Sequence, residues 1–467
     1  MYIVYDHILS RPYFDDKKEI DFFEKILTIF EEDKRRRQLI ERKFFISQHR
    51  FLSGLIPYIQ YHAEKANISI FLENPPVYSD IKEIVSPKDI VLRDYQVEVV
   101  KRSLYYGRGI NDLVTGAGKT VIAGTILLTL DKPSLFIVHT RELAEQTKDE
   151  FIRFGIDEKD VGIFSGQQKN LNKKHIIGLV QSLNRAVVRR EKEITDFLSS
   201  REILIIDETH HLPASSYMRV ANRCRAPYRF GLSGSVFVDM DSPTADTIRL
   251  MGVTGKIINQ ITYQDLLEKN YLSFSRCYFL NGSFQSFPVQ DDYMKMYKEC
   301  IVFNDERNDM ICKHAAEAYE NNQKVCIIVK IIEHGEILLQ KLFEKYHLQS
   351  YFYMGDNIVK TYKDGLRSYF ASSYLPISSF KEKDRFILIL SPAFFEGIDI
   401  PSISVIIRAD AGRSKKIDYQ VIGRGLRMKK DNSILTIIDF DDTFNYVFKH
   451  QSRKRRQNYS DLGIPIL

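Results

Sequence analysis

The chain has few cysteines and no long apolar run, and these absences exclude several classes of protein. Its five cysteines are scattered along 467 residues without a CxxC pair or a cluster with histidine at metal-ligand spacing. We therefore expect reduced, buried thiols in a cytoplasmic protein. No apolar stretch approaches the ~20 residues that span a bilayer. The first residues lack a basic region followed by an apolar core, so we expect neither a signal peptide nor a membrane partner.

Net charge sets a weaker limit on possible partners. The chain carries a formal charge of +6, a mild basic excess that permits a polyanionic partner without demanding one. No internal repeat is visible, and the length allows two to four domains that each bury a core.

What the sequence does contain is a glycine loop between an apolar segment and a helix-forming run. The loop is Thr115-Gly-Ala-Gly-Lys-Thr120, and the apolar run Val121–Leu130 follows it. Gly116 and Gly118 allow the backbone to bend so that successive N–H groups point at one phosphate-sized anion. The positive end of the following helix adds to this preference for an anion.

The side chains after the glycines supply the rest of a nucleotide site. Lys119 is a counter-charge for phosphate, and the Thr120 hydroxyl is available to Mg²⁺. The full phosphate-loop pattern has glycine at position 113, where this chain has Leu113. A chance match therefore stays open until a partner acidic motif is found.

An acidic pair after a later apolar strand provides that partner. The strand Ile203–Ile206 is followed directly by Asp207 and Glu208. In α/β sheets ligands bind at the carboxyl ends of strands, so both carboxylates are expected there. Asp207 would hold Mg²⁺ through water, and Glu208 would orient or deprotonate the attacking water. The alternative is an acidic turn, but together with the loop the pair predicts a nucleoside triphosphatase that uses Mg²⁺.

Two further stretches in the second half carry groups suited to a nucleotide. Tyr419–Arg427 places its polar residues along one face of a predicted helix, so that two guanidiniums reach one cleft and stabilise charge on a transferred phosphoryl group. The alternative is a salt-bridged surface helix. Phe395–Pro401 follows a strand and combines a glycine with an aspartate that can meet a ribose or an arginine. The candidates in these stretches are Gly397, Asp399, Gln420, Gly423, Arg424 and Arg427.

The order of strands and helices predicts an α/β fold with two tandem parallel sheets. Short β-branched runs alternate with amphipathic stretches, which is typical of a sheet covered on both faces. We expect a small N-terminal α+β domain that binds DNA through the charged run Glu31–Gln38, unless that run is a solvated helix face. Residues 355–384 resemble an insertion or mobile loop. The expected divisions are 1–88, 89–255, 256–445 and a basic tail at 446–467.

These residues resemble the motifs of a superfamily 2 helicase of the DExH kind, in the same order over residues 92–427. The resemblance implies two RecA-like lobes with ATP between them. It implies that Gln96 reads adenine, and that Thr115, Gly116, Ala117, Gly118, Lys119, Thr120, Gly397 and Asp399 bind the nucleotide. Thr140 and Arg141 would touch strand phosphates. His210, Ser233, Gly234, Ser235 and Gln420 would couple hydrolysis to movement, and Lys119, Asp207, Glu208, Arg424 and Arg427 would be catalytic.

A finer resemblance is to the UvsW-type recombination helicases of phages, through Phe230–Ser235, Ile422–Arg427 and the leading domain of about 90 residues. It implies a monomeric, bacterial or phage-encoded motor that unwinds and branch-migrates single-stranded, forked or four-way DNA, with a single-strand-binding protein or recombinase as partner. The rivals are an RNA helicase, the motor of a restriction or defence complex, and a switch that holds ATP without turnover. No second cluster resembles a nuclease.

Overall fold

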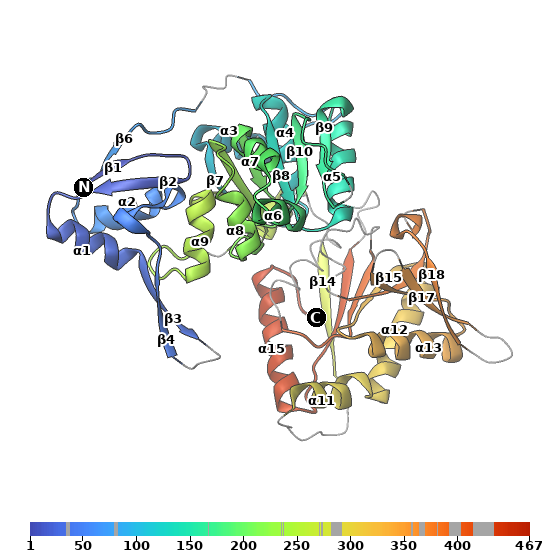
Figure 1. The fold of residues 1–467 in the computed structure, drawn as a ribbon. Helices are drawn as coiled ribbons and strands as arrows, with labels where there is room; N and C mark the ends of the chain where they lie inside the picture. The colour runs from blue at the N-terminus through green and yellow to red at the C-terminus, as the bar shows by residue number, and fades with distance from the viewer. Residues whose placement is uncertain are drawn as a thin grey trace. The chain divides into compact units, whose positions relative to one another are not determined.

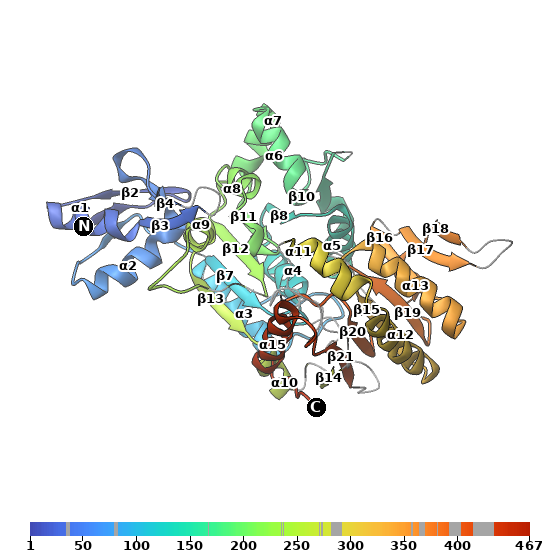
Figure 2. The same cartoon turned by 90° about the horizontal axis from the view of Figure 1, so that it is seen from below.

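The fold is described from a computed structural model in which the chain divides into two compact units, Met1–Ile261 and Thr262–Leu467. The residues that the structure describes are 1–33, 38–78, 83–166, 168–234, 236, 238–269, 271, 274–281, 292–355, 358–363, 369–380, 382–391, 403–413 and 434–467. Figures 1 and 2 show the elements of each unit. Among the described residues, no helix has both the length and the apolar character needed to cross a bilayer.

The first unit begins with a small α+β domain built on a four-stranded sheet of order β5-β2-β1-β6. Strands β3 and β4 form a separate antiparallel hairpin. The core of the domain joins Ile3, Phe23, Leu27, Phe51 and Ile59, all of which are almost fully buried. Its elements are β1 (Tyr2–Val4), β2 (Leu9–Tyr13), α1 (Lys17–Ile26), β3 (Thr28–Asp33), β4 (Gln38–Lys43), η1 (Ser47–His49), β5 (Phe51–Leu52), η2 (Ser53–Leu55), α2 (Ile56–Lys65) and β6 (Phe71–Glu73).

This N-terminal domain is packed tightly against the rest of the first unit. A Cβ on Gly54 would lie 2.1 Å from the carbonyl oxygen of Met251, so only glycine fits at this contact. Ile248 and Met251 belong to the same apolar core as the domain itself. At the edge of the contact, the Lys65 ammonium and the Asp241 carboxylate lie 2.5 Å apart. The domain and the lobe that follows it therefore form one compact unit.

The lobe that follows is a parallel sheet of order β13-β7-β12-β11-β8-β10-β9, with helices on both faces (Figure 2). Helices α3, α4 and α5 cover one face, and α6, α8 and α9 cover the other. The central strands β8 and β11 are almost entirely apolar because both of their faces are buried. Its elements are α3 (Asp94–Tyr106), β7 (Arg108–Leu113), α4 (Lys119–Leu130), β8 (Ser134–Val138), α5 (Arg141–Arg153), η3 (Glu158–Asp160), β9 (Val161–Phe164), β10 (His175–Leu179), α6 (Val180–Val188), α7 (Lys192–Ser200), β11 (Ile203–Ile206), η4 (Thr209–His211), α8 (Ser215–Ala221), β12 (Tyr228–Ser233), α9 (Ala245–Thr254) and β13 (Ile257–Ile261).

The second unit is a sheet of order β14-β21-β20-β15-β19-β16-β17-β18, parallel except at β17, which pairs antiparallel with both β16 and β18. Helices α12 and α13 pack on it around Ile327 and Ile389. Its elements are α10 (Tyr263–Glu268), β14 (Ser275–Leu280), α11 (Tyr293–Tyr297), η5 (Lys298–Val302), α12 (Asp305–Glu320), β15 (Lys324–Ile328), α13 (Ile332–Tyr346), β16 (Tyr351–Gly355), β17 (Ile358–Lys363), β18 (Tyr369–Tyr374), η6 (Ile377–Phe380), β19 (Phe386–Leu390), β20 (Val405–Arg408), β21 (Leu435–Phe440) and α15 (Tyr446–Asp461).

This architecture confirms the predicted fold of two tandem RecA-like lobes behind a small α+β domain, and it corrects three details. Residues 358–363 and 369–374 are paired strands of the second sheet, where a loop was expected. Strand β13 pairs with β7, so the first unit ends at Ile261 rather than at 255. The expected tail contains helix α15, which packs into the second unit through the fully buried Phe448 and Arg455.

Candidate functional site

The candidate site lies at the carboxyl ends of neighbouring parallel strands in the first lobe. Strands β7, β12, β11 and β8 lie side by side in that order. The loop after β7 is the glycine loop, and β11 leads directly into Asp207 and Glu208. Ser233 closes β12, and Thr140 follows β8. The sheet therefore gathers the sequence motifs of the first half at one edge, where α/β folds bind ligands.

The glycine loop has the backbone shape that its sequence predicted. Gly116 and Gly118 have φ values of 93° and 79°, in the left-handed region that favours glycine. Helix α4 starts immediately after Gly118, so its positive end adjoins the loop. On the neighbouring strand, a Cβ on Gly234 would lie 2.8 Å from the carbonyl oxygen of Leu113. Glycine at 234 thus permits the loop to pack directly against β12.

Gln96 lies beside this loop, in the first turn of α3. Its amide nitrogen donates to the carbonyl of Ala117 at 3.1 Å, and its amide oxygen accepts from the backbone N–H of Arg93 at 3.0 Å. The Tyr95 hydroxyl donates to the same carbonyl at 2.9 Å. Both ends of the Gln96 amide are thus bonded within the protein, and adenine recognition by Gln96 stays a prediction.

Lys119 and Glu208 face one another across the site. The Lys119 ammonium lies 3.8 Å from a Glu208 carboxylate oxygen, and both side chains are largely but not wholly buried. Glu208 has a φ of 46°, an unfavourable conformation for a residue with a side chain. Such strain is concentrated at functional sites and costs of order 1–3 kcal/mol.

The acidic pair is suited to a divalent cation. Burial, and next the Glu208 carboxylate, raise the pKa of Asp207. A bound cation would reverse that effect by favouring the charged carboxylate. Among the described residues, no group of three or more His, Cys, Asp or Glu side chains could enclose a metal ion. The Asp207–Glu208 pair beside the phosphate loop fits Mg²⁺, which keeps several waters and takes substrate phosphates as ligands.

A chain of contacts links the acidic pair to β12. The His210 Nδ1 atom lies 3.2 Å from Glu208 and 3.1 Å from the Ser233 hydroxyl. The Thr209 hydroxyl donates to the carbonyls of Ile206 and Leu232, at 2.7 and 3.2 Å. A displacement of Glu208 would therefore be transmitted through His210 to Ser233 at the end of β12.

Comparisons with known proteins match both lobes. Residues 89–237 match the family "Type III restriction enzyme, res subunit", and residues 306–429 match "Helicase conserved C-terminal domain". The chain belongs to superfamily 2 of the helicases. It is an ATP-hydrolysing enzyme of that superfamily, and it is related to the UvsW helicase.

Three relatives illustrate how far the similarity of this helicase extends. The DNA 3'-5' translocase XPB2 of Sulfurisphaera tokodaii is 26% identical over 79% of this chain and 85% of its own length. The ATP-dependent DNA helicase uvsW of Enterobacteria phage T4 is 25% identical over 79% of this chain and 74% of its own. A solved fragment of a putative HsdR subunit of a type I restriction enzyme from Vibrio vulnificus is 16% identical, with a TM-score of 0.58 over 96% of this chain and 81% of that one, and it supports the fold alone.

The strand-contacting candidates of the helicase lie on helix α5. Thr140 caps the helix by accepting from the N–H of Leu143 at 3.2 Å. Arg141 is half exposed and lies 3.8 Å from Glu145. Both residues are at the end of α5 that adjoins the carboxyl end of β8.

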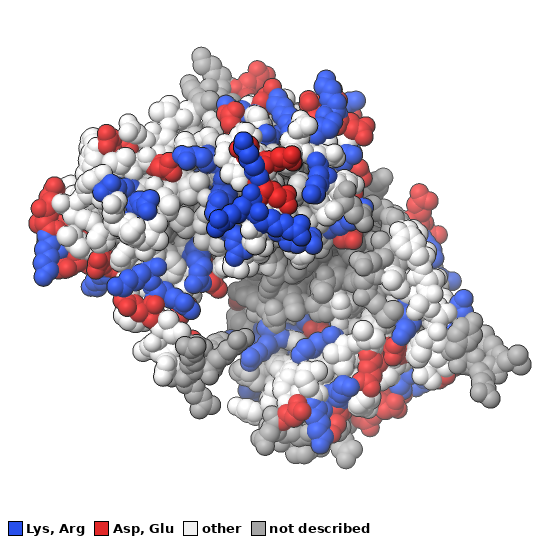
Figure 3. Space-filling view, viewed as in Figure 1, with Lys and Arg blue, Asp and Glu red and all other residues white. Residues whose placement is uncertain are grey.

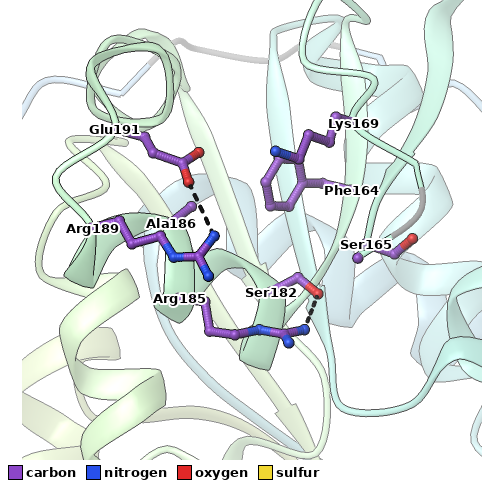
Figure 4. Close-up of a pocket in the computed structure, with 9 residues that line it drawn as sticks. Phe164, Ser165, Lys169, Ser182, Arg185, Ala186, Arg189 and Glu191 are labelled. Carbon is purple, nitrogen blue, oxygen red and sulfur yellow. Dashed lines mark hydrogen bonds and ion pairs between the residues drawn. The ribbon is translucent and has the colours of Figure 1, made fainter.

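A basic pocket beyond this helix was not singled out from the sequence. It is a cavity of about 170 Å³ after strand β9 and along helix α6 (Figure 4). Three of its lining residues are cationic: Lys169, Arg185 and Arg189. Arg185 donates to the Ser182 hydroxyl at 3.4 Å, and Arg189 lies 4.0 Å from Glu191. Figure 3 shows Lys and Arg side chains gathered on the first unit over helices α6 to α8. The four-residue spacing of Arg185 and Arg189 on one helix could have signalled the pocket.

The second lobe carries a buried ionic network at the carboxyl ends of β20 and β21. Arg307, Arg408 and Arg455 are fully buried, as are their aspartate partners Asp410, Asp439 and Asp442. Arg455 is 2.9 Å from Asp439 and 3.2 Å from Asp442, and Arg307 is 2.9 Å from Asp442. Arg408 is 2.8 Å from Asp410 and, with Arg455, lowers the pKa of Asp410 although burial alone would raise it.

Several predicted site residues lie outside the described residues, so their roles stay predictions. They are Ser235, Gly397, Asp399, Gln420, Gly423, Arg424 and Arg427, together with the basic run Lys34–Arg37 of the N-terminal domain.

Proposed function

We propose that this helicase is an ATP-dependent DNA translocase that unwinds and branch-migrates forked or four-way DNA in recombination, repair or replication restart. The observation that carries the proposal is the contact chain from Lys119 through Glu208 and His210 to Ser233. A protein that only held ATP would need no such link from the phosphate loop to a second strand end.

The proposed division of labour within the first lobe follows from position and charge. Lys119, with the backbone of the glycine loop, binds the terminal phosphates, and Glu208 orients the attacking water. The Thr120 hydroxyl and the Asp207 carboxylate would hold Mg²⁺, which when bound neutralises charge that develops on the phosphates. His210 transmits the state of Glu208 to Ser233. Arg424 and Arg427 are proposed to stabilise the transferred phosphoryl group.

The strand is proposed to run along the carboxyl edge of β8, β10 and β9. Thr140 and Arg141 lie at the end of β8, and the basic pocket lies after β9 and β10. An exposed row of cations beside a phosphate backbone releases counterions and binds without regard to sequence. Lys169, Arg185 and Arg189 therefore extend the contact that the sequence assigned to Thr140 and Arg141.

The names given to two of the relatives favour DNA over RNA as the substrate. XPB2 and uvsW are named as acting on DNA, whereas a mimivirus relative that is 26% identical over 78% of this chain is named a putative RNA helicase. The restriction-enzyme family description supports the motor of a restriction complex as a second candidate function. We place the protein in the cytoplasm of a bacterial cell, encoded by the cell or by a phage, with a single-strand-binding protein or recombinase as its partner.

The deciding experiment measures ATP turnover, strand separation and translocation in parallel, with no nucleic acid, single-stranded DNA, duplex, forked DNA, four-way DNA and RNA. Glu208→Gln is the control, because it keeps shape while it removes the charge that orients water. We expect DNA to stimulate the wild type, forks and four-way junctions to be unwound, and Glu208→Gln to lower turnover on the order of a hundredfold. Stimulation by RNA alone, or translocation on plain duplex without unwinding, would overturn the proposal.

A further inference from the structure

The open face of the N-terminal sheet carries a row of aromatic rings. Tyr13, Tyr2 and Phe71 are directly paired across strands β2, β1 and β6, so their side chains share one face. The Tyr2 ring centroid lies 6.0 Å from that of Tyr13 and 5.5 Å from that of Phe71. The next residue on β1, Ile3, points into the buried core. The aromatic row, meaning these three rings, is therefore on the face that points away from the core.

The row is accessible to a ligand from solution. Phe71 is 64% exposed and Tyr13 is 44% exposed. Cross-strand aromatic pairs stabilise a sheet, but that gain does not require Phe71 to leave most of its ring in water. An aromatic row left open in this way is therefore a candidate binding surface.

A cation at one end of the row favours a nucleic acid as its ligand. The Arg11 guanidinium lies 4.9 Å from the centre of the Tyr13 ring, on the same face. The Glu73 carboxylate, whose hydrogen bond raises the pKa of Tyr2, follows Phe71 on β6, so phosphates would contact the row at its Tyr13 end. A cation beside exposed rings is the combination that binds a strand by stacking its bases and contacting its backbone.

The exposed rings at the two ends of the row select an unpaired strand over a duplex. Tyr2 and Phe71 are stacked, with 7° between their ring planes, and the Tyr13 ring is tilted by 59° from Tyr2. A base can therefore stack on the exposed Phe71 or Tyr13 ring. A base inside a duplex has both faces covered by its neighbours, so a single strand is the ligand that can stack there.

We propose that Tyr13, Tyr2 and Phe71 form a stacking platform for the unpaired bases of single-stranded DNA, with Arg11 contacting its phosphates. The choice of DNA rests on the proposed function, but the site is separate from the motor. Because the domain is packed against the first lobe through Gly54 and Met251, the platform and the phosphate loop belong to one compact unit. A strand released by unwinding could be held there while the motor steps.

The absence of tryptophan from the chain provides a local test. Phe71→Trp places a single indole in the platform, and Tyr105→Trp is the matched control. Tyr105 is 78% exposed and lies at the end of α3 near the start of β7, opposite the carboxyl edge of the sheet. Each variant of the full-length chain is titrated without nucleotide with a thymidine oligonucleotide of about 16 residues, with an abasic strand of equal length, and with a blunt duplex. Anisotropy of labelled DNA checks that each strand binds.

Stacking on the indole should quench the fluorescence of Phe71→Trp with the thymidine strand, by at least about twofold more than with the abasic strand or the duplex. Tyr105→Trp should show no quenching. Equal quenching by the abasic strand, or no quenching while anisotropy shows saturation, would overturn the platform. Quenching by a proline-rich peptide in place of DNA would also overturn it, because aromatic surfaces bind such peptides. Since no ATP is present, these outcomes are independent of the turnover experiment.

Discussion

Replacing Arg455 by methionine should destabilise the second lobe far more than the equivalent change at its neighbour Arg456. Arg455 is fully buried in helix α15, and its guanidinium binds Asp439, Asp442 and two carbonyls. Methionine matches much of the length of the side chain but carries no charge. Arg456, the next residue of the same helix, pairs with Asp441 just after β21, but its side chain remains 36% exposed.

The size of the effect follows from what the substitution leaves behind. Removing one partner of a buried ion pair typically costs 3–5 kcal/mol, because the other charge stays buried. Arg307 still binds Asp442, and the Tyr459 hydroxyl still donates to Asp439 at 2.6 Å. We therefore expect the low end, about 3 kcal/mol, which is on the order of a hundredfold in an opening equilibrium. Arg456→Ala should cost about 1 kcal/mol or less, as half-exposed pairs do.

Hydrogen exchange of the full-length chain measures this opening locally. Peptides from residues 435–461 of Arg455→Met should exchange on the order of a hundred times faster than wild type, and those of Arg456→Ala at most several times faster. Peptides from the first unit should be unchanged in both variants. Equal exchange for the two variants would refute the view that burial of the network, and not the mere presence of ion pairs, holds α15 in place.

The remaining predictions concern strand binding and pH. For Arg141→Ala, the slope of log K for single-strand binding against log salt concentration should become shallower by about 0.7, because one phosphate contact is lost. Arg153→Ala, about 18 Å away at the other end of α5, should leave the slope unchanged; equal slopes would remove Arg141 from the strand path. Burial, aided by the Arg307 cation and opposed by Asp410, lowers the pKa of His334 to about 3. The pKa of an unfolded histidine is about 6.5, so between pH 3 and pH 6.5 the unfolded chain binds more protons than the folded one. The free energy of unfolding of the second unit should therefore fall by about 2 kcal/mol as the pH falls from 7 to 5. His334→Gln, which keeps a donor for Asn308, should flatten that dependence in hydrogen exchange of α12 and α13; an unchanged dependence would contradict the assignment.

The sequence predicted the features of this fold that are decided locally. The phosphate loop requires positive φ values that favour glycine, and the two glycines Gly116 and Gly118 in the sequence indicate where they occur. The strand Ile203–Ile206 is a short apolar run bounded by polar residues, and it is found as predicted. The glycine loop and this strand depend on residues that are adjacent in the chain. Their positions, and the acidic pair after the strand, could therefore be predicted from the sequence alone.

The features that the sequence did not reveal depend on partners far along the chain. Arg455 reads as part of a basic tail until Asp439 and Asp442 are placed beside it. The strands at 358–363 and 369–374 carry few apolar residues in a regular pattern, and their pairing with each other and with β16 defines them. The aromatic row could not be seen either, because only strand register brings Tyr2 beside Phe71.

The polar groups at the strand ends have different roles in the two lobes. Exposed groups can bind a ligand, whereas buried and paired groups stabilise the fold. In the first lobe Lys119 and Glu208 remain 16% and 22% exposed, so a substrate phosphate can reach them. In the second lobe Asp439 and Arg455 are fully buried and paired, so they cannot contact a ligand. Arg455 also donates to the carbonyl of Gly412 at 3.0 Å, and this bond joins the segment after β20 to helix α15. The buried network therefore holds α15, β21 and the end of β20 together, which is a structural role and not a ligand-binding one.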